Sequence, residues 1–107
     1  MSQGETPGME AVTLAGCVAL VGTPFTRPNP DGPDITLVLT EASRLKRDPR
    51  ASAEGDRPFH LIFRGPPDPR LTQGMHTLIS PHLDLSGIFL VPLDQDEEGF
   101  IYEAVFT

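Results

Sequence analysis

The sequence of 107 residues holds one cysteine, few basic residues and no long hydrophobic run, and each shortage excludes a class of protein. Cys17 has no partner for an intramolecular disulfide, so we expect it to serve as a small buried apolar residue. Eight basic residues stand against 15 acidic ones, and the net charge of −7 repels nucleic acid, so no nucleic-acid partner is expected. The apolar stretch 14–22 is too short to span a bilayer, and no membrane insertion is expected.

The N-terminal segment also lacks the features of a targeting sequence. Residues 1–9 are polar and rich in glycine and proline, which is typical of a flexible tail. They carry no basic region, so they predict no signal peptide, and we expect synthesis in the cytoplasm. The final location stays open and includes an exported or virion-like assembly. Residues 10–107 have the usual size of one domain.

Prolines and glycines, in contrast, are abundant. The 12 prolines and 10 glycines predict many turns and few long helices. Between Glu10 and Val21, apolar residues recur every three or four positions, which favours one short helix with Thr13 as its N-cap and Gly22 at its stop. A strand is the alternative, because the valines and leucines of this segment also suit a sheet.

Most of the remaining chain shows the alternation of apolar and polar residues that is typical of strands. We expect strands at 23–27, 34–43, 58–64, 73–80, 87–93 and 99–107. The run 87–93 is apolar on both faces, which predicts a central strand that is covered on each side. Pro92 has no backbone N–H to donate, so we expect this strand to fray or bulge there.

The final run predicts the core and the fold class. It places Phe100, Tyr102, Ala104 and Phe106 on one face, where three aromatic rings would dominate the interior. Five or six antiparallel strands in one small domain indicate a mainly all-β fold. We expect a small antiparallel barrel or sandwich of five to six strands with one short N-terminal helix. The pattern leaves the choice between barrel and sandwich open, and also the strand order.

Residues that could hold a metal are scattered along the sequence. His60, His76 and His82 lack the close spacing of zinc ligands. His60 and His76 would be neighbours if their strands paired, and both are expected on the face opposite the larger apolar residues. The acidic stretch 94–98 lacks the spacing of a calcium loop and is expected to be a solvated hairpin tip. We therefore expect no metal and no cofactor.

Glu103 is a charge inside an otherwise apolar strand. It must face solvent, pair with a base such as Arg64, or line a pocket. Carboxylate catalysis would need a second positioned acid, and Asp84 is one candidate. Because nothing in the sequence brings these two acids together, we expect no catalytic residues and no enzyme activity.

Several motifs resemble, in the same order, those of a small uncharacterised bacterial domain family. They are PFHLIFRGP at 58–66, QGMHTL at 73–78, FLVP at 89–92 and YEAVF at 102–106. His76 departs from this family, in which a tyrosine is common at that position. The family is often encoded near phage-tail-collar-like proteins and has no assigned catalytic residues. The resemblance implies a compact β domain that works in, or beside, a tail-like or surface assembly.

Our leading hypothesis is a non-enzymatic structural or interaction protein that docks onto a larger assembly. A sheet edge and a hydrophobic patch would make the contact, and the basic loop 44–57 would adjust it. The partners would be proteins of that assembly or further copies of this chain. The expected contact residues lie on two strands and are Phe59, Leu61, Phe63, Arg64, Tyr102, Glu103 and Phe106. The alternative is a small ligand-binding β-barrel, which needs more strands than six to leave room inside.

Overall fold

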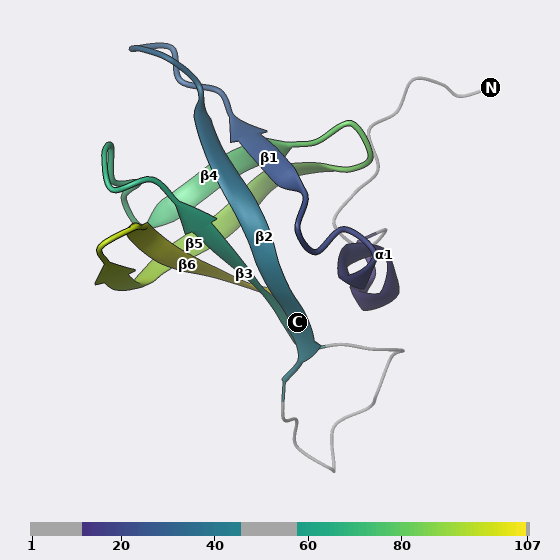
Figure 1. The fold of residues 1–107 in the computed structure, drawn as a ribbon. Coiled ribbons are helices and arrows are strands. Elements are labelled where there is room, and N and C mark those ends of the chain that lie inside the picture. Colours follow the sequence, from purple (N-terminus) through teal and green to yellow (C-terminus); the bar gives the residue numbers. More distant parts are fainter. Residues whose placement is uncertain (1–11, 46–57, 107) are drawn as a thin grey trace, which may run out of the picture.

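The computed structural model describes residues 12–45 and 58–106, which form one short helix and six strands (Figure 1). The elements are α1 (Leu14–Val18), β1 (Pro24–Arg27), β2 (Ile35–Arg44), β3 (Phe59–Gly65), β4 (Gly74–Ile79), β5 (Asp84–Asp96) and β6 (Gly99–Phe106). The predicted tail 1–9 and most of the predicted loop 44–57 lie outside the described residues. Within the described ranges, no helix is long and apolar enough to cross a membrane.

The helix α1 is shorter than the pattern over residues 10–21 predicted. Thr13 is the N-cap, as predicted, and its hydroxyl accepts a 3.1 Å hydrogen bond from the N–H of Gly16. After the last turn, the N–H of Leu20 bonds to the carbonyl of Cys17, three residues back, and this tighter winding ends the α-helix. The side chain of Cys17 is buried, which confirms its expected apolar role.

The six strands close into a barrel with the order β1-β2-β3-β6-β5-β4, and every neighbouring pair is antiparallel. The predicted mainly-β fold, its strand number and its short helix are confirmed, and the structure decides for a barrel over a sandwich. In this order β6 lies between β3 and β5. The strands that carry the expected contact residues, β3 and β6, are therefore neighbours.

Alternate side chains fill the inside of the barrel. The largest fully buried ones include Tyr102, Phe25, Phe59 and Phe63. Phe59 stacks on Phe106 with 5.0 Å between ring centroids, and Phe25 meets Phe63 edge to face at 5.6 Å. The aromatic core face predicted for the final strand is confirmed. Side chains, rather than open space, occupy the interior.

The strand β5 differs from its prediction. It runs for 13 residues, and its first part pairs with β4 while its second part pairs with β6. Ile88 and Leu90 face the interior, but Phe89 and Leu93 are 49% and 53% exposed, so the prediction that both faces are covered is wrong. A closed barrel has one interior, and the outer face of each strand is left for solvent or a partner.

Two bulges bend β5 from one neighbour to the other. At the first, β5 contributes Ser86 and Gly87 opposite the single residue Thr77 of β4. Gly87 has a φ of 71°, a conformation that glycine adopts without strain. The second bulge follows Pro92, as the missing N–H of that residue predicted.

The acidic hairpin tip is shorter than predicted. The strand β5 continues through Asp96, and only two glutamates form the turn before β6 begins at Gly99. Gly99 has a φ of 147°, and a side chain there would collide with the backbone carbonyl of Gly65. The start of β6 therefore lies so close to the end of β3 that only glycine fits at position 99.

Candidate functional site

The structure separates the seven expected contact residues into two groups. Five lie inside the barrel, where their side chains are at most 6% exposed: Phe59, Leu61, Phe63, Tyr102 and Phe106. Arg64 and Glu103 lie on the outer face and are partly exposed. Because a buried side chain cannot touch a partner, a docking surface has to be built from other residues.

Arg64 is engaged by the hairpin tip between β5 and β6. Its guanidinium makes two parallel 2.8 Å hydrogen bonds to the carboxylate of Asp96, and Glu98 lies 3.7 Å away. These hydrogen bonds lower the pKa of the Asp96 carboxyl from 3.8 to about 2. Arg64 therefore holds the tip in place, and its pairing with Glu103, one of the alternatives that the sequence left open, is not found.

Glu103 instead pairs with His60 on the neighbouring strand β3. Its carboxylate lies 2.8 Å from Nδ1 of His60, while Nε2 of the same ring lies 2.8 Å from the hydroxyl of Ser43 on β2. The Ser43 hydroxyl also donates a 2.8 Å hydrogen bond to Glu41. These four residues form a polar network that links β2, β3 and β6 on the outer face of the barrel.

The network has the distances of a serine–histidine–carboxylate triad, but its hydrogen bonds run the other way. A nucleophilic serine must give its proton to the histidine. Here the hydroxyl of Ser43 donates to Glu41, and this bond is the largest cause of the lowered pKa of the Glu41 carboxyl. Ser43 can then only accept a hydrogen bond from Nε2 of His60. The arrangement is that of a cross-strand connection.

The condition under which two of the histidines would be neighbours, a pairing of their strands, is not met. His60 lies on β3 and His76 on β4, and these strands share no ladder in the barrel. His76 lies opposite Met75 and Ile79 as expected, but its face is the inner one, where it is 7% exposed beside Leu78. Asp84, the proposed second acid for Glu103, pairs with β4 at the far end of β5. Among the described residues, no group of three or more acids, histidines or cysteines is placed to hold a metal.

A different feature stands out at the junction of β1 and β4, which we call the seam. One residue pair, Thr26 with Ile79, joins these strands. Among the described residues, no second residue pair joins β1 and β4. The stretch Gly74–Leu78 of β4 therefore pairs with β5 only. The seam is thus an open strand edge in an otherwise closed barrel.

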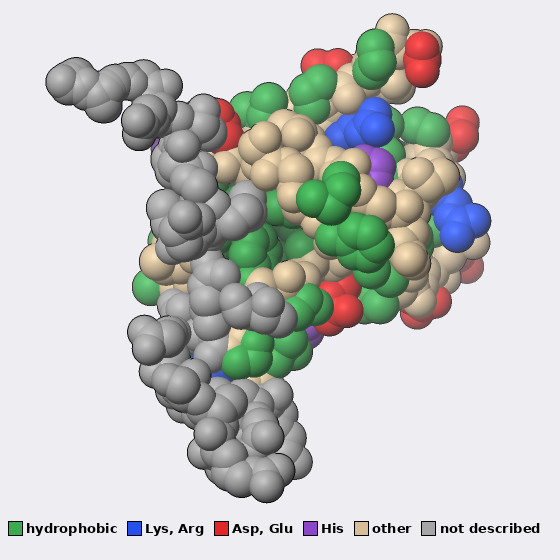
Figure 2. All heavy atoms as spheres, turned by 180° about the vertical axis from the view of Figure 1, so that it is seen from behind, with side chains coloured by type: hydrophobic (Ala, Val, Ile, Leu, Met, Phe, Trp, Pro, Cys, Tyr) green, Lys and Arg blue, Asp and Glu red, His purple; other side chains and the backbone are tan. Residues whose placement is uncertain are grey.

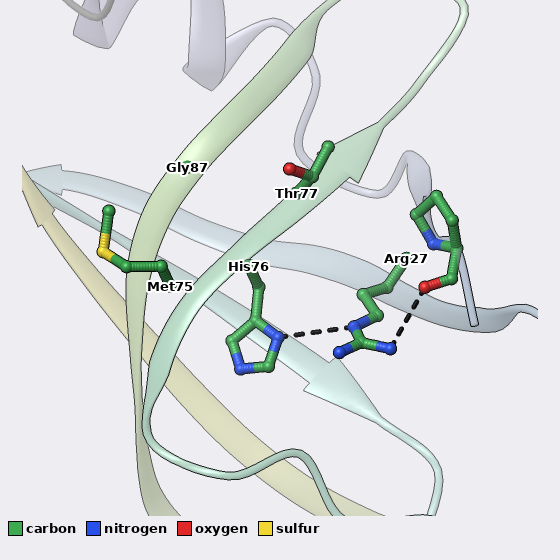
Figure 3. A pocket seen from close by; sticks show the side chains of 6 residues that line it. Arg27, Met75, His76, Thr77 and Gly87 are labelled. Carbon is green, nitrogen blue, oxygen red and sulfur yellow. Dashed lines mark hydrogen bonds between the residues drawn. The ribbon is translucent and has the colours of Figure 1, made fainter. Parts of the chain in front are cut away.

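A pocket of about 280 Å³ lies at the seam, and we call it the seam pocket (Figure 3). Its lining comes from the end of β1, the start of β4 and the bulge of β5, and consists of Arg27, Pro28, Met75, His76, Thr77 and Gly87. In the close view, Arg27 and His76 point toward each other, while Met75 lies over Gly87 on the other side.

Exposed apolar side chains continue from the pocket over the outer face of β4 and β5. Met75 and Phe89 are direct cross-strand partners, and they are 65% and 49% exposed. Figure 2 looks onto this face and shows hydrophobic side chains gathered at its centre, next to a basic side chain and a histidine. We call Met75 and Phe89 the apolar pair.

A sequence profile of a known family matches residues 12–106, almost the whole described fold. The chain belongs to the DUF6916 family. That family is described as a domain of unknown function. No curated protein and no solved structure matches the chain.

The seam of this DUF6916 domain was missed by the sequence analysis. Arg27 follows the buried Phe25 by two residues in β1, and His76 precedes the buried Leu78 by two in β4. This spacing puts both polar side chains on the inner faces of their strands, and it could have identified them as candidate site residues. Arg27 and His76 meet because β1 closes against β4, and the local sequence pattern does not predict this closure.

Proposed function

We propose that this DUF6916 domain is a non-enzymatic interaction module that docks onto a larger assembly by pairing with an extended segment of a protein partner. The partner segment would lie along the open edge of β4, at Gly74–Thr77. The observation that carries this proposal is the single residue pair between β1 and β4, next to the exposed apolar pair.

An open strand edge presents N–H and C=O groups that can form a ladder with another chain. In such strand addition, main-chain hydrogen bonds supply affinity, and pockets for alternate side chains supply specificity. The β4 edge has both, because Met75 and the seam pocket lie beside it. This geometry favours an extended peptide over a globular surface as the occupant.

The packed interior favours docking over the alternative of a ligand inside the barrel. A barrel of six strands fills with side chains. Leu37, Leu39, Leu61 and Leu90 are fully buried here together with the aromatic residues. The two pockets described lie at the seam and at the acidic hairpin tip, both on the outside of the barrel.

The polar network of Ser43 and His60 likewise favours a non-enzymatic role. Its hydrogen bonds hold strands together and do not activate the serine. The resemblance of the C-terminal motifs to a family encoded near tail-collar-like proteins suggests the destination, a tail-like or surface assembly. We propose that the chain is made in the cytoplasm and meets its partner afterwards.

The test is capture of the partner with matched surface variants. Extract of the native organism is passed over the tagged domain, over the double variant Met75→Thr with Phe89→Thr, and over Val21→Thr as control. Val21 is 45% exposed but lies after α1, away from β4. We expect a stoichiometric partner that the wild type and the control retain and that the double variant loses at least tenfold.

Hydrogen exchange on the captured complex then locates the contact. We expect the amides of Gly74–Thr77 to gain protection on binding. Equal capture by the double variant, or protection confined to other strands, would overturn the proposal. A dimer of this chain that protects the same amides would replace the foreign partner with a second copy.

A further inference from the structure

We infer that the seam pocket recognises a carboxylate on the docking segment, and that Arg27 is the residue that binds it. This inference rests on the proposed function, because it names the chemistry of the segment that pairs with β4. It rests equally on Arg27 itself, whose surroundings differ from those of Arg64.

The guanidinium of Arg27 has hydrogen-bond donors to spare. Of its five N–H groups, Nε donates to Nδ1 of His76 at 3.3 Å and one terminal nitrogen donates to the carbonyl of Pro28 at 3.0 Å. Three N–H groups are left without a protein acceptor in the described residues. The terminal nitrogen on the His76 side carries no dashed line in Figure 3.

No carboxylate of the described residues forms an ion pair with Arg27. Arg27 thus lies beside a pocket without an acidic partner among the described residues, although the chain carries 15 acidic residues and a net charge of −7. Arg64 shows the ordinary outcome, because it makes a bidentate pair with Asp96. The unmatched charge of Arg27 therefore complements a carboxylate that comes from outside.

The two hydrogen bonds hold the guanidinium in position before any ligand arrives. Nε2 of His76 lies 2.7 Å from the carbonyl of Thr72, which can only accept, so Nε2 carries a proton. Nδ1 is then the acceptor for Arg27. Because His76 is almost fully buried, this support is rigid. A fixed arginine loses little conformational entropy on binding, which raises affinity.

The rest of the pocket defines the group that carries the carboxylate. Met75 and Pro28 are apolar, and Gly87 leaves room because it has no side chain. A short apolar stem with one carboxylate fits a lining with one cation. Such a group is an aspartate or glutamate side chain of the segment, or its C-terminal carboxylate.

The test titrates isotope-labelled protein with propionate, with propionamide and with inorganic phosphate at constant ionic strength, and follows the NMR signal of the Arg27 Nε–H. We expect a saturable shift with propionate, together with shifts of the amides at Gly74–Thr77, and at least tenfold weaker binding of propionamide. A linear, unsaturated response to propionate, or an equal response to propionamide, overturns the inference. Tighter binding of phosphate than of propionate replaces the carboxylate with a phosphate group and also overturns it.

Variants separate recognition by Arg27 from general charge. Arg27→Gln should abolish the preference for propionate over propionamide. Arg27→Lys keeps the positive charge but loses the two-pronged guanidinium, so it should keep only part of this preference. Arg70→Gln is the matched control, since Arg70 is exposed and lies over the ring of Phe100, at 5.6 Å from its centroid. An Arg70→Gln variant that loses the preference equally would contradict the assignment.

Blocked tripeptides then distinguish the source of the carboxylate. Val-Asp-Val with both ends capped presents a side-chain carboxylate, Val-Asn-Val is its neutral match, and Val-Val-Val with a free C-terminus presents a terminal one. Tighter binding of either acid than of the neutral peptide supports the inference and names the source. If all three tripeptides protect the β4 amides equally, the proposed docking at the β4 edge is supported and the proposed role of Arg27 is excluded. If propionate binds but the partner is captured elsewhere, the proposed function falls and an anion pocket remains.

Discussion

The hydroxyl of Tyr102, in the middle of β6, accepts a 2.9 Å hydrogen bond from the backbone N–H of Leu71 in the connection that precedes β4. Both residues are buried. The next residue, Thr72, supplies the carbonyl that accepts the proton of His76. One hydrogen bond in the core thus positions the connection that supports the seam pocket.

Replacing Tyr102 with Phe should lower the free energy of unfolding by about 1–3 kcal/mol, because the buried N–H of Leu71 then has no acceptor. Urea unfolding of both proteins measures this difference. Hydrogen exchange should also show faster exchange at Leu71 and at the start of β4. An unchanged stability would mean that water replaces the hydroxyl and that the connection is held by its other contacts.

Gly99 and Gly74 provide a matched pair for backbone effects. Their φ angles are 147° and 151°, but an added Cβ would meet the Gly65 carbonyl at Gly99 and open space at Gly74. Gly74→Ala should cost about 1–3 kcal/mol from backbone strain. Gly99→Ala should cost distinctly more than that, because the clash adds to the strain. Thermal unfolding compares them, and similar melting temperatures would contradict the close approach of β6 to β3.

The pair of Arg64 and Asp96 predicts a loss of stability in acid. The Asp96 carboxyl has a pKa of about 2 in the fold, against an ordinary value of 3.8, because Arg64 bonds to its charged form. A carboxyl with a lowered pKa stabilises the fold above the ordinary value, and this contribution is lost as the pH falls through the folded value.

Asp96→Asn should therefore show a smaller drop in stability than the wild type between about pH 4 and pH 2. Asparagine can still accept the backbone hydrogen bonds of the turn, so the comparison isolates the charge. Asp84→Asn is the control, because Asp84 is exposed and has no ion pair among the described residues. Parallel curves for the wild type and Asp96→Asn would exclude this contribution.

The polar network centred on His60 should contribute to stability and not to reactivity. His60→Ala breaks the contacts with Ser43 and Glu103, so we expect a loss of about 1 kcal/mol in the free energy of unfolding. His82→Ala, at an exposed position in the turn after β4, should stay within about 0.5 kcal/mol of the wild type. Equal effects of the two substitutions would show that the network is solvated and inert.

Local patterns were sufficient to predict most strands of this fold. The alternation in β6 identified its core face, and Pro92 identified a bulge, because both depend on neighbours along the chain. The exposure of Phe89 could not be predicted in this way. It follows from the change of partner along β5, which turns one face of an apolar strand outward.

The candidate site was harder to predict than the fold. Glu103 was recognised as unusual, but its partner is His60 and not Arg64. Register places both bases diagonally opposite Glu103, and Arg64 is instead bound by Asp96 at the hairpin tip, which the local pattern does not show. Arg27 and His76 are 49 positions apart in sequence, and barrel closure alone brings them together. A site formed by closure is visible once the strand order is known.

The open edge of β4 also exposes the free domain to a hazard that a fully closed barrel avoids. Copies that meet in solution could join edge to edge and continue into aggregates. The net charge of −7 opposes such encounters, because each copy repels the next over the screening length of the solution. Salt weakens this repulsion, so free copies should aggregate faster at high protein concentration and high ionic strength. The surplus of acidic residues thus keeps free copies of the domain apart, whichever partner the β4 edge binds.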